Sequence, residues 1–329
     1  MVSPALFLQL PITTYQLPLT TYALDKEEAN MANVATYPQA WKLKDESVRQ
    51  RSVWGMAMQR FLRNRTATVG LIFLVLIFLI AAVPSLFAHF GRDEANFVDA
   101  WQGPSARYWF GTDALGRDVY TRILYGIQTS MLVGLTTQAL LLVIGIGLGG
   151  LAGMAGGKTD FAIMRLVDVM AAFPQLLFTI LLMATLGIGL RNIVIALVIP
   201  GWVSLCQITR AQILSLRETV FVQAAAMIGA RPGHILRRHL LPNMIAPIIV
   251  NVSFSLPGII MAEAGLSFLG AGIAKPRPSL GQMVAEGGQN ITYYWHLALF
   301  PALVLALIIL AFAYVADGLR DALDPSQTR

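Results

Sequence analysis

The sequence predicts an all-α integral membrane protein with six transmembrane helices and with its N- and C-termini in the cytoplasm. Of its 329 residues, 56% are hydrophobic and only 13% are charged, and the mean hydropathy is +0.63. Soluble domains carry more charge, roughly 25%, so this composition indicates a protein that faces lipid. Uncharged apolar runs long enough to cross a bilayer recur along the chain, and basic residues flank them unevenly.

Residues 1–45 are predicted to be a flexible cytoplasmic extension. Four prolines lie in residues 1–38, and no basic residue precedes the mildly apolar start, which argues against a secretory signal. Met31 offers a second possible start, so whether residues 1–30 are translated stays open.

Residues 46–122 are predicted to hold an amphipathic helix, the first span and an external loop. Residues 46–65 place apolar side chains against five arginines, a pattern typical of a helix lying on an anionic membrane face. Residues 66–91 carry no formal charge and form the first predicted span. The external loop covers residues 92–122.

Two acidic residues in this loop, Asp113 and Asp118, have basic neighbours at similar distances in sequence, Arg117 and Arg122. We therefore expect structural ion pairs here, and neither a metal site nor an acid–base pair.

Residues 123–318 are predicted to form the core, with five further spans. The uncharged run 123–157 contains four glycines at every fourth position: Gly145, Gly149, Gly153 and Gly157. On a helix they share one face, which predicts close approach of a neighbouring helix.

The same run contains two apparent phosphate-binding patterns, and neither has the required context. Gly145, Gly147 and Gly150 match G-x-G-x-x-G, but inside a span and not after a strand. The Gly157–Thr159 triplet lacks the earlier glycine, because Ala152 stands there. We expect no nucleotide or other cofactor on this polypeptide.

The remaining spans follow a short segment with basic flanks, residues 158–168. They are predicted at residues 169–190, 192–207, 243–263 and 297–316, and residues 319–329 form a cytoplasmic tail. Pro174 and Pro200 are expected to bend the helices that contain them.

The distribution of basic residues sets the predicted orientation. With the N-terminus and the polar loop 208–242 inside, 16 lysines and arginines lie in the cytoplasm and 7 outside, with Lys26 uncounted. Six spans with both ends inside is the arrangement that the positive-inside rule favours.

Loop 208–242 contains the most informative stretch. Residues 217–228 are good helix formers, Gly229 suits the position just past a helix end, and Pro232 suits the first turn of a second short helix that ends at His239. Two short helices at the membrane surface predict a docking feature.

The loop resembles the Glu-Ala-Ala loop of permease subunits of prokaryotic ABC importers. Gln223, Ala224 and Ala225 match the triplet, Gly229 follows after three residues, and the motif closes with His239, Leu241 and Pro242. Gln223 replaces the usual acid and His239 the usual isoleucine. The words FGTD-x-LGRD in the external loop and the sequence after Leu266 are similar to the second permease of the peptide branch.

This resemblance implies the permease fold of type I ABC importers in a bacterial inner membrane. It implies a homologous permease as a heterodimer partner, two cytoplasmic ATP-binding subunits, an external solute-binding protein, and a cargo of oligopeptides or dipeptides. The seven motif residues would contact the ATPase. The chain itself would not be an enzyme, because ATP hydrolysis belongs to the partners.

Several alternatives stay open. The same family pattern serves nickel and oligosaccharide permeases. A secondary transporter driven by an ion gradient would need intramembrane acids or histidines. Glu263, at the end of a predicted span, either lines the translocation path or caps its helix.

A membrane enzyme would need a nucleophile or metal cluster, and the four histidines are too scattered to form one. Nucleic acid is not expected, because the basic residues flank spans.

Overall fold

The computed structural model describes residues 53–324, and these belong to one compact unit, Ser52–Arg329. The predictions for residues 1–52 and for residues 325–329 fall outside the described residues. The described chain is helical, with one isolated β-bridge between Thr112 and Asp118 in the loop that precedes α3.

Eleven α-helices carry the fold within residues 53–324. They are α1 Val53–Arg63, α2 Arg65–Ala82, α3 Val119–Ala155, α4 Gly157–Ala171, α5 Gln175–Leu186, α6 Leu190–Arg217, α7 Val220–Met227, α8 Pro232–Ile235, α9 Leu241–Phe268, α10 Leu280–Gly288 and α11 Trp295–Leu323. Side-chain caps fix several starts: Asn64 accepts from the amide of Ala67 at α2, and Asp118 from that of Thr121 at α3.

Five helical stretches are long and apolar enough to cross a membrane: α2, α3, α6, the continuous stretch Pro232–Phe268, and α11. The bent pair α4 and α5 supplies a sixth if it is counted as one span. The first predicted span was too long, because α2 ends at Ala82 and residues 83–91 belong to the loop. The second starts earlier than predicted, at Val119.

The third predicted span requires a larger correction. Residues 158–168 are helical and not a short connection, and α4 meets α5 at an angle of 85° around Pro174. Proline has no amide hydrogen and disfavours a helical conformation in the residue before it, so the helix breaks here. Arg210 of α6 holds α4 in place through two hydrogen bonds to Asp160, of 2.5 and 2.6 Å.

The polar loop also differs from its prediction. Helix α6 continues past residue 207 to Arg217, and the first loop helix starts only at Val220. The second loop helix does not stop at His239, because the π-helical turn Leu236–Leu240 joins α8 to α9. In this turn the amide of Leu241 donates to the carbonyl of Leu236, five residues earlier, which is the hydrogen bond of a π-helix. The next residue, Pro242, has no amide hydrogen and so cannot donate.

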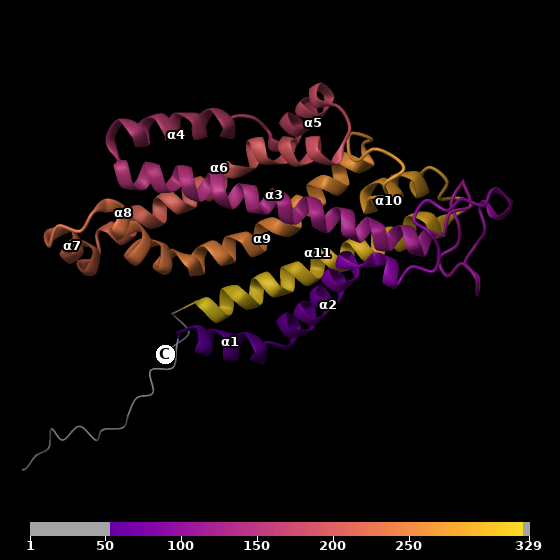
Figure 1. The fold of residues 1–329 in the computed structure, drawn as a ribbon, viewed down its shortest axis with the longest axis horizontal. Helices are drawn as coiled ribbons and strands as arrows, with labels where there is room; N and C mark the ends of the chain where they lie inside the picture. The colour runs from indigo at the N-terminus through magenta and orange to yellow at the C-terminus, as the bar shows by residue number, and fades with distance from the viewer. Residues whose placement is uncertain (1–52, 325–329) are drawn as a thin grey trace, which may run out of the picture. The chain divides into compact units, whose positions relative to one another are not determined.

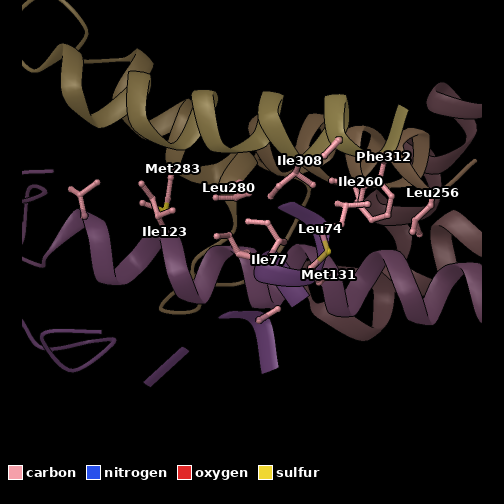
Figure 2. Packing of buried hydrophobic residues seen from close by; sticks show 14 of the residues in the cluster. Leu74, Ile77, Ile123, Met131, Leu256, Ile260, Leu280, Met283, Ile308 and Phe312 are labelled. Atoms are coloured by element: carbon pink, nitrogen blue, oxygen red, sulfur yellow. The ribbon is translucent and has the colours of Figure 1, made fainter. Parts of the chain in front are cut away.

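Helix α3 is the long central element and runs beside α6 over much of its length (Figure 1). Helices α2 and α11 pack against each other, and α2 also packs against α3. Figure 2 shows the core between them, where side chains of α2, α3, α9, α10 and α11 meet. Its members include Leu74, Ile77, Met131, Ile260, Leu280 and Ile308.

Three of the four predicted glycines form the contact between α3 and α6. A side chain at Gly145 would meet Leu205, one at Gly149 the carbonyl oxygen of Cys206, and one at Gly153 the side chain of Ile213. Gly157 is different, because it begins α4 with a φ of +52° and open space around it. The glycine face therefore ends at Gly153.

We expect Gly149→Leu to disrupt this contact, because its Cβ atom alone would collide with backbone that cannot move aside. Overpacking of this kind costs about 1–3 kcal/mol or more. The measurement is the yield and melting temperature of the purified protein in detergent. Gly147→Leu is the matched control, since Gly147 of the same helix has nothing within 4 Å. Equal stability of the two variants would show that α3 and α6 are not in close contact.

Candidate functional site

Helices α7 and α8 form a hairpin between the ends of α6 and α9 (Figure 1). The loop between α2 and α3 lies at the opposite end of this helical unit, together with α10. Any protein that binds the hairpin can therefore act on α6 and α9 together, from one end of the spans.

The turn in the hairpin is a glycine cap. Gly229 has a φ of +82°, its amide donates to the carbonyl of Ala226, and the amide of Ala230 donates to that of Ala225. This pair of bonds is the Schellman motif, which needs a left-handed residue just past the helix end. Pro232 then occupies the first turn of α8, as predicted.

One side of the hairpin is fixed to the spans by apolar packing. Val222, Ala225 and Ile235 are buried against Ile213 of α6 and Met244 of α9. In addition, the guanidinium of Arg217 donates to the carbonyl of Gly153 at 2.8 Å, which ties the start of the hairpin to α3. The hairpin is thus attached to three spans.

The other side of the hairpin is apolar and exposed. Val220, Phe221, Met227 and Ile228 show 82%, 44%, 88% and 87% of their surfaces. Single exposed apolar residues are common, but four around one short helix indicate an interaction surface. These four residues are not part of the sequence motif. Their apolar side chains alone do not show whether this face of the helix is buried or exposed.

The seven residues of the predicted motif separate into two groups. Gln223, Ala224, Gly229 and Pro242 are exposed, whereas His239 and Leu241 are half-buried and Ala225 is buried. The side-chain amide of Gln223 donates to the carbonyl of Glu218, so it supports the start of the hairpin.

At the opposite end, the two loop acids have different partners. Asp113 accepts from the Nε of Arg117 at 2.7 Å and pairs with Arg122 at 3.5 Å, as predicted. Asp118 caps α3 and makes no ion pair that we observe within residues 53–324, which corrects its expected role. Stacked rings, Trp101 on Tyr294 and Phe110 on Phe300, hold the loop against α11 and the turn before it.

Near the same end of α3, Tyr108 is buried and donates its hydroxyl to Asp99 at 2.8 Å. Burial and this hydrogen bond raise the pKa of the Tyr108 phenol, so it is neutral at physiological pH.

The expectation that Glu263 caps its helix is wrong, because it lies inside α9, five residues before the helix ends at Phe268. Its side chain is fully buried, and its place in the translocation path stays a prediction. Its two carboxylate oxygens accept from Ser130 of α3 and from Ser267 of α9, both at 2.8 Å. The carboxylate therefore joins α3 to α9 inside the core. Within residues 53–324, no group of three metal-ligating side chains is present.

The comparisons with known families match two parts of the chain. Residues 145–329 match the model of the binding-protein-dependent transport system inner membrane component. Residues 52–104 match the N-terminal transmembrane domain of oligopeptide transport permease C.

Curated relatives match over most of their length. The oligopeptide transport system permease protein OppC of Bacillus subtilis (strain 168) is 41% identical, over 85% of this chain and 92% of the relative. The dipeptide transport system permease protein DppC of the same organism is 39% identical, over 83% and 86%. The glutathione transport system permease protein GsiD of Pectobacterium atrosepticum is 37% identical, over 89% and 96%.

A solved structure supports the fold. A chain of the inward-facing MetNI methionine ABC transporter aligns with a TM-score of 0.52 and 18% identity, over 62% of this chain and 96% of that one. At this identity the likeness shows the fold alone, which is that of a type I importer permease.

We expect Glu263→Ala to lower the stability of the protein, because it leaves the hydroxyls of Ser130 and Ser267 buried without a partner. Each unpaired group costs about 1–3 kcal/mol. Glu263→Gln should retain much of the stability, since its carbonyl oxygen still accepts. Melting temperatures in detergent compare the two variants. An unchanged value for Glu263→Ala would mean that the carboxylate does not hold α3 and α9 together.

Proposed function

The chain belongs to the family of binding-protein-dependent transport system inner membrane components, and from this premise we propose that it forms the membrane path of an ATP-driven peptide importer. It is a multi-pass protein of the bacterial inner membrane. The observation that supports this proposal is the exposed apolar face of α7. A permease that is driven by a separate ATPase subunit needs such a surface for the ATPase to bind.

The relatives support peptides as the cargo. The proteins reported above are named for oligopeptide, dipeptide or glutathione transport, and the N-terminal match is to an oligopeptide permease. Nothing in these comparisons favours nickel or oligosaccharides. We infer that the chain is the second of two related permeases in a complex with two ATPase subunits and an external binding protein.

The hairpin is the proposed site of contact with the ATPase. With the orientation predicted from the basic residues, α7 and α8 face the cytoplasm and the loop before α3 faces outward. The exposed side of α7 would dock on an ATPase subunit, and the buried side would pass the movement to α6 and α9. Because the buried side is packed and not hinged, closure of the ATPases would move these helices as rigid bodies.

An ion-driven transporter is less compatible with the structure. Such proteins use intramembrane acids or histidines that can exchange ions with a water-filled path. Glu263 is the acidic residue within the described span α9. Its side chain is fully buried, and its two carboxylate oxygens accept hydrogen bonds from Ser130 and Ser267. A relay through this carboxylate would require α3 and α9 to separate.

The first test of the function is uptake of labelled peptide by cells or vesicles that contain the full complex. We expect uptake to require the partner ATPase genes and the binding protein, and to continue after an uncoupler removes the proton gradient. Uptake that stops with the uncoupler while ATP is maintained would support the ion-driven alternative instead.

The second test concerns the turn. Gly229→Val forces a β-branched residue into the left-handed region, which costs on the order of 1 kcal/mol or more and disturbs the cap. We expect the variant to reach the membrane but to lose coupling, with at least a several-fold fall in peptide uptake per ATP hydrolysed. Reconstituted complexes allow both rates to be measured together.

Gly233→Val is the matched control for this test. Gly233 lies in α8 of the same hairpin, also with nothing within 4 Å, but it does not have the positive φ of Gly229. Wild-type coupling in Gly229→Val, or equal losses in both variants, would contradict the role of this turn.

A further inference from the structure

A cavity of about 350 Å³ lies between α3, α5, α6 and α9. It is within the usual size of ligand sites, roughly 300–1,000 Å³. Its wall on α6 is near the middle of that helix, around Gly201 and Ser204, and its wall on α9 is formed at Ser255 and Gly258. The cavity therefore lies at the depth of the spans, away from both the hairpin and the external loop.

The wall consists of matched helix faces. On α6 and on α9 a glycine and a serine stand three residues apart, so they lie on one face of each helix. A Cβ atom added at Gly201 would lie 3.8 Å from the side-chain nitrogen of Gln175, which places this amide over α6. Nothing lies within 4 Å of the position that a Cβ atom would take at Gly258. Gly258 thus keeps space open beside Ser255, whereas a Cβ atom at Gly201 would already meet the side chain of Leu141 of α3 at 3.0 Å.

Two of the polar groups are free to bind a ligand. Among residues 53–324, the side chains of Gln175 and Ser204 have no hydrogen-bond partner, and both are exposed. The hydroxyl of Ser255 donates to Gln138 at 2.7 Å and that of Thr179 to the carbonyl of Gln175 at 2.8 Å, and both oxygens can still accept. Unpaired polar side chains at membrane depth are costly, which points to a function.

The cavity lining contains no ionisable side chain. A ligand that suits it is neutral and carries both donors and acceptors, because amide and hydroxyl side chains offer both. We propose that this cavity binds the backbone amides of peptide cargo on its way through the membrane. The proposal rests on the function proposed above and identifies Gln175 and Ser204 as cargo contacts.

Backbone recognition fits a path that accepts peptides of different sequence. Each cargo amide that enters the spans loses water, and leaving an amide without a hydrogen-bond partner in an apolar medium is unfavourable. Neutral side chains can replace that water without selecting for the charge of the cargo. A lipid chain would leave Gln175 and Ser204 unpaired, so an apolar occupant fits the site less well.

The first test fills the cavity with Gly258→Leu in the complete complex, reconstituted with its ATPases and binding protein. We expect normal complex yield and normal stimulation of ATP hydrolysis by the loaded binding protein, together with at least a ten-fold loss of peptide uptake. Gly147→Leu is the control, because it adds the same side chain at an open position of α3 that does not line the cavity. It should transport normally.

The second test removes the free polar groups with the double variant Gln175→Leu and Ser204→Ala. Losing a hydrogen bond corresponds to roughly five-fold in affinity, so we expect uptake at limiting cargo to fall about 5- to 25-fold. The loss should be smaller for a peptide with N-methylated amides, which offers fewer donors, when both peptides are supplied on preloaded binding protein. Thr185→Val is the control, since this hydroxyl of α5 bonds to the carbonyl of Leu182.

Wild-type uptake by Gly258→Leu would overturn the proposal, and so would equal losses for the two peptides in the double variant. A fall in complex yield for Gly258→Leu would also overturn it, because it would show that a neighbouring subunit fills the cavity. These outcomes leave the importer function standing as long as the unmodified complex takes up peptide with ATP. If that complex takes up no peptide, the proposed function itself fails.

Discussion

The close contact between α3 and α6 connects the parts of this molecule. It exists because Gly145, Gly149 and Gly153 have no side chains to hold the helices apart. Helix α3 also contacts α2, α9 and α10, while α6 leads directly into the hairpin and, through Arg210, holds α4. Without the contact, the side of the bundle with α4, α5 and α6 would lose its main attachment to the rest.

Helix α9 is the second helix that connects several parts of the molecule: the hairpin, the cavity and α3. Its start is continuous with α8 through a π-helical turn, so it receives any movement of the hairpin. Its middle forms one wall of the cavity at Ser255 and Gly258. Farther on, Glu263 joins it to α3. A movement that begins at the hairpin therefore reaches the cavity wall through one helix, and the hydrogen bond at Glu263 limits how far α9 can slide along α3.

Polar side chains within the spans differ in what surrounds them, and this difference indicates their roles. Glu263 is sealed and has both oxygens paired, which is how a buried carboxylate contributes to structure. Gln175 and Ser204 are exposed to the cavity and have no hydrogen-bond partner, so their polar groups are available to a ligand. The sequence singles out the charged residue Glu263, whereas the fold leaves the neutral residues Gln175 and Ser204 accessible.

The sequence by itself determined the membrane class, the family, the approximate spans and the turn at Gly229. These depend on local properties: the length of apolar runs, the spacing of a short motif, and the need for glycine at a left-handed position. Only the tertiary structure decided which residues of α6 the glycine face meets, the burial of Glu263 and the cavity. Each of these depends on which residue from a distant helix lies opposite, and a single sequence does not record that.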